Sequence, residues 1–438
     1  MSFQQGLSGL NATSKSLDVI GNNIANSNTY GAKVARAEFS DVYSAALGGA
    51  GSNAVGIGTS LASISQQFTQ GTITTTENPL DLAINGGGFF QVTDGKSPIG
   101  YTRNGQFKVD RDGYIVNNNQ QRLVGYVADN TGTILPGAAQ AIKLPTNGVE
   151  PQATSKIDLA FNLDSRAGTY TPPAAGPQVD FFDPATFTNA TSQTVYDAKG
   201  QEVALTYYFQ KSASDSWNVF VTANGQTLAG TAAAPQRLFE IGFAADGSRI
   251  VSIGDPAAPL VADPVTGDFP PAEFAFDIPA TTNSSGASTL PILGIDIDLT
   301  PATQFGSGFG VTDISQDGYA AGQLTSISIE ANGIITARYS NGQTKPAAQI
   351  EIATFRNLQG LQPLGDNQWG RTFASGDPIV GAPGEANFGL LQSGALEESN
   401  VDLTAELVNM ITAQRTYQAN AQTIKTQDQV LQTLVNLR

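Results

Sequence analysis

The chain has 438 residues, of which 40% are hydrophobic and only 14% are charged. Histidine and cysteine are absent, which excludes Ser-His-Asp and Cys-His catalysis, disulfides and the usual zinc and iron–sulfur sites. The net charge of −16 repels phosphate backbones and anionic lipid headgroups, so we expect neither nucleic acid nor a membrane surface as a partner. This composition favours a structural role over an enzymatic one.

The start of the chain lacks the features of a secretory signal, because its first charge is Lys15 and its apolar residues are spaced apart. The sequence also has no apolar run of about 18 residues, so we expect no membrane insertion. Low charge and the absence of cysteine are typical of a protein assembled outside the cell. The missing signal and the composition of an extracellular protein are compatible if the chain is exported by a route that does not use a cleaved signal.

Both ends of the chain are predicted to be amphipathic helices, over residues 1–24 and 401–438. Apolar residues recur at alternating steps of four and three, which is the spacing of a coiled coil. We call these residues the apolar seam: Phe3, Leu7, Leu10, Leu17 and Ile24 in the first helix, and Leu403, Leu407, Met410, Tyr417, Ile424, Leu431 and Val435 in the second. Residues 400–402 can supply an N-cap for the second helix. The alternative is two ordinary helices within the core of one domain.

Few charges lie on these two helices. Residues 1–30 carry only Lys15 and Asp18, and Gln, Asn, Thr and Ser occupy positions where Glu and Lys are usual. Many copies of such a helix pair can pack together without charge repulsion. The seam is therefore predicted to be a subunit interface in an assembly.

Short alternating strands separated by tight-turn dipeptides fill the region between the helices. One run of hairpins covers residues 89–116, and a similar run returns over residues 326–353. The two runs are expected to close on each other as one inner β-domain, made of residues 76–146 and 318–384. Residues 25–75 with 385–400 are rich in glycine and are expected to form an extended linking region.

Residues 147–317 differ in charge, with 19 acids and 6 bases giving −13 of the total −16. This segment is predicted to be an inserted outer β-domain exposed to solvent. The fold class is thus multidomain and mainly β, with nested discontinuous domains and a helical coiled coil formed by the two termini.

Motifs that could carry chemistry are weak. Residues 110–113 (DRDG) begin like a calcium loop but lack its later ligands, so a hairpin turn explains them better. Gly86-Gly87-Gly88 precedes Phe89 rather than a helix, which indicates a loop with unusual φ angles rather than a phosphate cradle. Asp296 and Asp298 share one strand face, a spacing that a glycosidase could use, but such pairs arise readily in an acidic segment. We assign no catalytic, cofactor or metal residues.

Five longer stretches are more specific. Residues 20–33 read IGNNIANSNTYGAK, and residues 393–438 begin SGALEESNVDL. With NPLDLAINGGGFFQV at 78–92, YTRNGQFKVDRDGYIV at 101–116 and QDGYAAGQL at 316–324, they resemble the axial proteins of the bacterial flagellum, and within these the hook proteins in particular. The family motif falls on Asn22, Asn23, Ala25, Asn26, Thr29, Gly31 and Lys33.

The resemblance implies a subunit of the hook, a tubular helical homopolymer that acts as a flexible coupling between motor and filament. It implies an extracellular location at the flagellum after export by the flagellar type III apparatus. It also implies contacts with the distal rod protein, the hook cap, the hook–filament junction proteins and the hook-length control protein. Alternatives are a distal rod protein, which is much shorter, or, from a different class, a secreted β-rich carbohydrate-active enzyme or adhesin.

Overall fold

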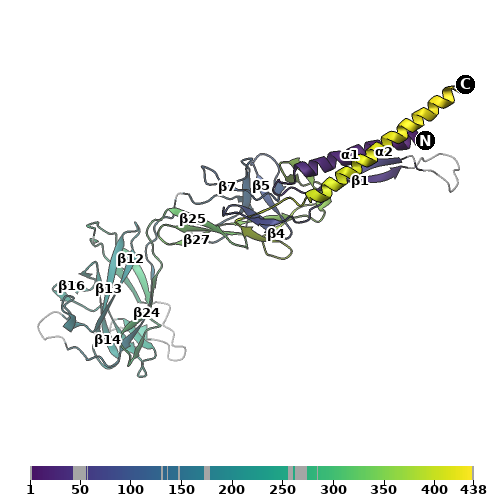
Figure 1. The fold of residues 1–438 in the computed structure, drawn as a ribbon. Coiled ribbons are helices and arrows are strands. Elements are labelled where there is room, and N and C mark those ends of the chain that lie inside the picture. The colour runs from purple at the N-terminus through teal and green to yellow at the C-terminus, as the bar shows by residue number, and fades with distance from the viewer. Residues whose placement is uncertain are drawn as a thin grey trace. The chain divides into compact units, whose positions relative to one another are not determined.

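The computed structural model describes residues 2–42, 56, 58–129, 132–135, 137–146, 148–171, 178–254, 260–261, 274–283 and 285–436. As predicted, the described chain is mainly β-structure with one helix at each end, α1 (Ser2–Ala25) and α2 (Leu403–Asn436) (Figure 1). It divides into two compact units. The first unit combines both ends of the chain, as Met1–Thr146, Thr325–Arg338 and Thr344–Arg438, and the second comprises Asn147–Leu324 with Tyr339–Gln343.

The second helix begins at its predicted cap. The Asp402 carboxylate accepts hydrogen bonds from the backbone N–H groups of Thr404 (2.9 Å) and Ala405 (3.1 Å), which satisfies two donors of the first turn. Threonines along α2 donate their hydroxyl hydrogen bonds to the carbonyl four residues earlier, as Thr412 does to Val408 at 2.9 Å. A helix with this many exposed polar residues therefore satisfies its hydroxyl groups internally.

The first unit is built around a 13-stranded sheet in which β9 lies between β5 and β27. Strands of the early hairpin run thus pair with strands of the late run, for example β9 with β27 through Tyr126 and Gln349. The bounds in this unit are β1 Ala35–Val42, β2 Gly58–Gln66, β3 Ile73–Thr75, β4 Leu82–Asn85, β5 Phe89–Thr93, β6 Gly100–Thr102, β7 Lys108–Val109, β8 Ile115–Val116, β9 Arg122–Val127, β10 Gln140–Ala141, β25 Leu324–Ile329, β26 Ile334–Tyr339, β27 Thr344–Ile350, β28 Ile352–Thr354, η2 Leu358–Gly360, β29 Gln362–Gly365, β30 Gln368–Gly370, β31 Ile379–Gly381, β32 Leu390–Ser393 and β33 Ala395–Glu397.

Two pairs of strands join the early and late chain segments of this unit. β3 pairs with β33, and β4 pairs with β32, so residues that are more than 300 positions apart in sequence share two-stranded ladders. These pairings bring the chain that follows α1 next to the chain that precedes α2. Both helices consequently leave the β-structure from the same place.

Part of the predicted linking region is regular. β1 and β2 form an antiparallel hairpin that contacts α1, with a bulge between Glu38 and Phe39. Gly48, Gly49 and Gly51, which contributed to the prediction of a linker, lie outside the described residues. A linking role for residues 25–75 and 385–400 stays a prediction.

The turn and loop predictions within the inner β-structure are confirmed. The Asp110 carboxylate accepts hydrogen bonds from the backbone N–H groups of Asp112 (2.9 Å) and Tyr114 (2.7 Å), which makes residues 110–114 a turn. Gly86 and Gly88 have φ angles of 114° and 133°, a region that side chains larger than hydrogen disfavour.

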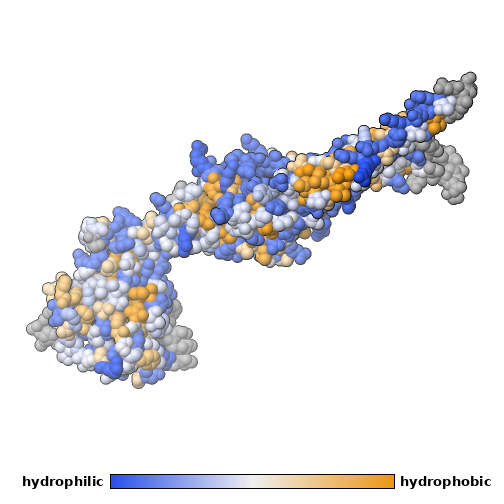
Figure 2. Space-filling view, viewed as in Figure 1, coloured by the Kyte–Doolittle hydropathy of each residue, from blue (hydrophilic) through white to orange (hydrophobic). Residues whose placement is uncertain are grey.

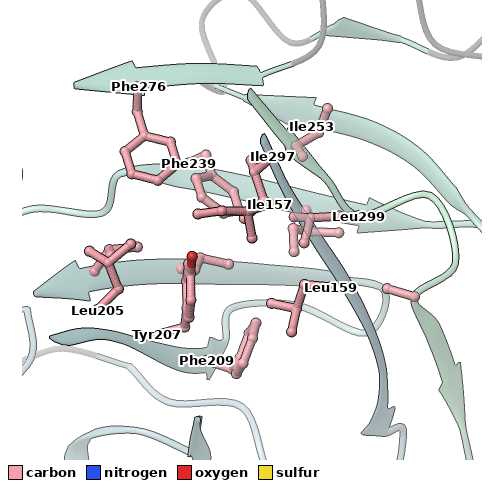
Figure 3. Packing of buried hydrophobic residues seen from close by; sticks show 14 of the residues in the cluster. Ile157, Leu159, Leu205, Tyr207, Phe209, Phe239, Ile253, Phe276, Ile297 and Leu299 are labelled. Carbon is pink, nitrogen blue, oxygen red and sulfur yellow. The ribbon is translucent and has the colours of Figure 1, made fainter. Parts of the chain in front are cut away.

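The second unit is a β-sandwich with one apolar core. A five-stranded and a seven-stranded sheet contribute to the same buried cluster, in which Tyr207, Leu205 and Leu159 are fully buried (Figure 3). Its elements are β11 Lys156–Asp164, η1 Pro184–Thr186, β12 Asn189–Tyr196, β13 Glu202–Lys211, β14 Ser216–Ala223, β15 Gln226–Thr227, β16 Gly230–Thr231, β17 Ala234–Pro235, β18 Phe239–Phe243, β19 Ile250–Gly254, β20 Leu260–Val261, β21 Phe274–Ile278, β22 Ile292–Asp298, β23 Thr303–Phe305 and β24 Gly310–Gln316. Asp296 and Asp298 point away from this core, because Ile295 and Ile297 between and beside them point into it.

Candidate functional site

The two terminal helices pack against each other in an antiparallel pair, and glycines allow their close approach. A Cβ atom at Gly6 would lie 3.0 Å from the Ile424 side chain, and one at Gly9 would lie 2.8 Å from the Asn420 amide. Residues near the start of α1 therefore face the later part of α2. Because small residues occupy the contact, the two backbones lie closer than a leucine-lined seam would allow.

Most of the apolar seam remains open in the single chain. Leu10, Leu17, Ile24, Met410 and Ile424 are half-buried, whereas Phe3, Leu7, Leu403, Leu407, Tyr417 and Leu431 are exposed by 38–49% of their surface. The side chain of Val435 lies outside the described residues. Figure 2 shows hydrophobic residues gathered on the surface where the helices leave the β-structure. Ile424 is the seam residue that meets α1 at Gly6.

A buried ionic joint lies at the base of the helix pair. The Glu397 carboxylate, on β33, accepts a hydrogen bond from the Lys33 ammonium at 2.5 Å and from the Arg103 guanidinium at 3.0 Å. All three residues are at most 8% exposed. One acid is thus shared by two cations that come from different parts of the chain. We call Lys33, Arg103 and Glu397 the ionic joint.

The ionic joint is extended by backbone contacts. Lys33 also donates to the Thr69 carbonyl at 2.8 Å, and Arg103 donates to the Gly86 carbonyl at 2.8 Å. Burial lowers the pKa of Lys33 and the pKa of Arg103, and the nearby Glu397 carboxylate opposes this shift at both cations. The joint therefore depends on Glu397 to hold two positive charges away from water.

Residues of the family motif position this joint. Asn23 is 3% exposed, and its side-chain amide pairs with both backbone groups of Ala35, donating to the carbonyl at 2.8 Å and accepting from the N–H at 2.9 Å. Gly31 has a φ of 71° and donates its N–H to the Glu397 carbonyl at 2.8 Å. A Cβ atom at Gly31 would lie 2.5 Å from the Asn104 nitrogen, so only glycine fits there.

The other motif residues make a turn at the end of α1. Asn26 donates from its side chain to the Asn22 carbonyl at 2.9 Å, and the Thr29 N–H donates to the Asn26 carbonyl at 3.1 Å. Ala25 is the last residue of α1 and is exposed. Asn22, Asn26 and Thr29 thus shape the exit from the helix, while Asn23, Gly31 and Lys33 fix it to the rest of the unit.

Asn400 secures the chain just before α2. Its side-chain carbonyl accepts from the Val34 N–H at 2.8 Å, and its amide donates to the carbonyl groups of Gln67 (2.8 Å) and Thr69 (3.1 Å). No local pattern in the sequence singles out Arg103 or Glu397 as a site residue, and the capping pattern at 400–402 does not predict the long-range contacts of Asn400. All three lie inside the family-like stretches at 101–116 and 393–438, so the resemblance is the signal that could have found them.

A groove of about 540 Å³ runs along one side of the helix pair. Its walls come from α1, the β1–β2 hairpin and the first half of α2, and they include Ala12, Ile20, Ala37, Asn409 and Glu406. Among the described residues, no member of the apolar seam lines this groove. The groove and the seam are therefore separate surfaces.

Neither α1 nor α2 has an apolar stretch long enough to cross a membrane, and the same holds for every helix in the described part of the chain. Among the described residues, no three acidic side chains gather closely enough to hold a metal ion.

Four family models match successive parts of the chain. They are "Flagella basal body rod protein" at residues 3–33, "Flagellar hook protein FlgE/F/G D1 domain" at 83–156, "Flagellar basal body protein FlaE D2 domain" at 162–319, and "Flagellar basal body rod FlgEFG protein C-terminal" at 392–437. The first and last models cover the two helices and the motif that builds the ionic joint. The fold and these four matches thus indicate the class of flagellar rod and hook proteins.

Sequence identity to individual proteins distinguishes between the rod and hook members of this class. The chain is 39% identical to the flagellar hook protein FlgE of Salmonella typhimurium and 34% identical to that of Borreliella burgdorferi, covering 100% of this chain and 100% and 99% of the relatives. This chain belongs to the family of flagellar hook proteins, which are structural proteins. A crystal structure of the Helicobacter pylori flagellar hook protein FlgE2 has the same fold, with a TM-score of 0.52 and 15% identity over 74% of this chain and 100% of that one.

Proposed function

We propose that many copies of this chain polymerise into the tube of the flagellar hook, which works as a flexible coupling that transmits motor torque to the filament. The observation that carries this proposal is the apolar seam, whose larger side chains are exposed in the single chain. Burying an exposed leucine contributes about 1.5–3 kcal/mol. A repeated contact through Phe3, Leu7, Leu403, Leu407, Tyr417 and Leu431, with Leu10, Leu17, Ile24, Met410, Ile424 and Val435, would therefore favour association strongly.

The proposed arrangement assigns a layer of the tube to each part of the chain. Residues 1–24 with 401–438 form the inner layer, residues 25–75 with 385–400 link it to the β-structure, and residues 76–146 with 318–384 form the inner β-domain. Residues 147–317 lie at the largest radius, where a net charge of −13 is spread over an outer surface and screened by salt within about 8 Å. Contacts between such acidic surfaces are weak and can slide when the tube bends.

The proposal includes the export route and partners implied by the family. The chain passes through the flagellar type III apparatus without a cleaved signal, and the absence of cysteine suits this route because no disulfide can block an unfolded chain. The distal rod protein, the hook cap, the junction proteins and the length-control protein are its proposed neighbours. No catalytic activity is proposed.

Assembly of the purified protein tests the function. We expect salt-induced formation of short curved tubes that are visible by negative-stain electron microscopy. Leu407→Asp should raise the critical concentration at least tenfold, because a carboxylate would be buried in the contact. Thr426→Asp introduces the same charge at an exposed site of α2 that is not part of the seam, and it should have a smaller effect. Persistent monomers under all salt conditions, or equal effects of the two variants, would contradict the proposal.

A further inference from the structure

The end of α2 has no partner among the described residues of its own chain. Gly6 meets Ile424 and Gly9 meets Asn420, so an antiparallel α1 that begins at Ser2 reaches only to about residue 428. α2 continues to Asn436, and Figure 1 shows it extending past the N-terminus. We call residues 429–436 the overhang. Val430 and Leu431 of the overhang are exposed by 48% and 49% of their surface.

At the other end of the helix pair, the groove contains an unsatisfied acceptor. The Oε2 atom of Glu406 is buried and has no hydrogen-bond partner among the described residues. A buried carboxylate oxygen without a donor is costly, because it has lost its water without gaining a replacement. The groove around it is lined both by apolar residues, such as Val19 and Ile20, and by polar residues, such as Asn409 and Thr412. Arg36 also lines it, and its guanidinium pairs with Glu38. This combination fits an occupant that brings both apolar side chains and a hydrogen-bond donor.

The overhang has this chemistry. Its sequence, QVLQTLVN, carries no charged side chain, so it can enter a groove that contains a carboxylate without repulsion. Val430 and Leu431 supply apolar groups, and the Gln429 side-chain amide supplies a donor for a carboxylate oxygen. A volume of about 540 Å³ is in the range of pockets that enclose several side chains.

The overhang cannot fill the groove of its own copy. Glu406 and Leu431 lie on one continuous helix and are 25 residues apart, which corresponds to about 37 Å at 1.5 Å per residue. We propose that the overhang of one copy docks in the groove of a second copy of this chain, with Glu406 accepting a hydrogen bond from it. This inference rests on the proposed polymerisation and names two surfaces that take part in it.

The contact joins two different surfaces, so it is heterologous, and each copy retains a free overhang or groove for the next. Repeated heterologous contacts give an open helical filament when the rotation does not close a ring. Contacting copies would then be offset by about 37 Å along the α2 axis. The seam residues outside the overhang, from Phe3 to Ile24 in α1 and from Leu403 to Ile424 in α2, remain available for contacts to other neighbours.

Engineered disulfides test this inference directly, because the chain has no native cysteine. In the variant Asn409→Cys/Leu431→Cys, both positions lie on α2 and are about 33 Å apart, so any disulfide must join two copies. We expect oxidation of assembled tubes to give a ladder of covalent multimers on a non-reducing gel, and oxidation of dilute monomers to give none. The control Arg415→Cys/Leu431→Cys uses an exposed site that does not line the groove, and it should give no ladder.

Two other outcomes would overturn the inference while leaving the polymer intact. Tubes that give a ladder with Leu407→Cys/Leu431→Cys but not with Asn409→Cys/Leu431→Cys would place the overhang on the seam. Tubes whose map shows residues 43–55 of the same chain in the groove would give the groove an internal occupant. If no tubes form for the unmodified chain, the proposed function itself fails.

Glu406→Ala supplies a second measurement. Because the Oε2 atom has no partner among the described residues, we expect the thermal midpoint of the monomer to change by only a few degrees. The critical concentration for assembly should rise at least fivefold. An unchanged critical concentration would overturn the role of Glu406.

Discussion

Glu397 is shared by two cations in the ionic joint. Removing its charge should therefore destabilise the protein more than removing the charge of one cation. The Glu397→Gln variant would leave Lys33 and Arg103 buried without an acid, so we expect it to lower the free energy of unfolding by about 3–5 kcal/mol. Lys33→Met should cost less, because Arg103 still pairs with Glu397. Urea denaturation of the monomer measures both. The control Glu398→Gln makes the same chemical change one residue further along the chain, outside the joint. If it lowered the free energy of unfolding as much as Glu397→Gln does, this account would be contradicted.

Tyr126 makes the stability of the first unit depend on pH in the alkaline range. Burial and a 2.7 Å hydrogen bond to the Glu351 carboxylate raise the pKa of Tyr126 from its usual 10.0 to about 12. The folded state therefore holds this proton more tightly than the unfolded state does. The stabilisation that protonated Tyr126 gives to the folded state is complete below pH 10 and is lost as the pH rises toward 12. We expect Tyr126→Phe to lose less stability than the unmodified chain over this interval, as measured by urea denaturation at several pH values. Parallel losses in both proteins would contradict the prediction.

Within the helix pair, glycines at different positions have different roles. A Cβ atom added at Gly21 would meet no other atom within 4 Å, so Gly21→Ala should stabilise α1 by about 0.5–1 kcal/mol through helix propensity. Gly6→Ala gains the same propensity, but its Cβ would lie 3.0 Å from the Ile424 side chain. We expect the second variant to gain less or to lose stability. Thermal unfolding followed by circular dichroism compares them, and equal gains would show that the helices are not held close at Gly6.

The second unit contains its own core, and we expect the fragment 147–324 to fold alone with one cooperative transition. All residues of its buried cluster lie between Ile157 and Ala302. In this fragment, Trp217→Ala should cost about 3–5 kcal/mol, because the side chain is fully buried and its indole N–H donates to Gln304 at 3.0 Å. Phe182→Ala removes an aromatic ring that is 96% exposed and should change stability by less than about 0.5 kcal/mol. Calorimetry of the fragment and both variants tests this.

The sequence alone determined the features that are local in the chain. The four-three spacing predicted both terminal helices, Asp402 supplied the predicted cap, and turn residues such as those at 110–114 predicted hairpins. The resemblance carried by the family motif predicted the flagellar hook family, which the relatives show. These signals were readable because helix periodicity, capping and tight turns depend on residues within a few positions of each other.

The tertiary structure decided which residues meet across the chain. Lys33, Arg103 and Glu397 are separated by up to 364 positions, and no local pattern shows that one carboxylate serves both cations. The spacing of the seam likewise did not show that α1 and α2 meet at Gly6 and Gly9 and leave Leu403 and Leu407 exposed. Periodicity gives the apolar face of a helix, but the contact that forms depends on how closely two backbones can approach. That distance is set by the residues of both helices that meet, here Gly6 and Gly9 of α1 with Ile424 and Asn420 of α2.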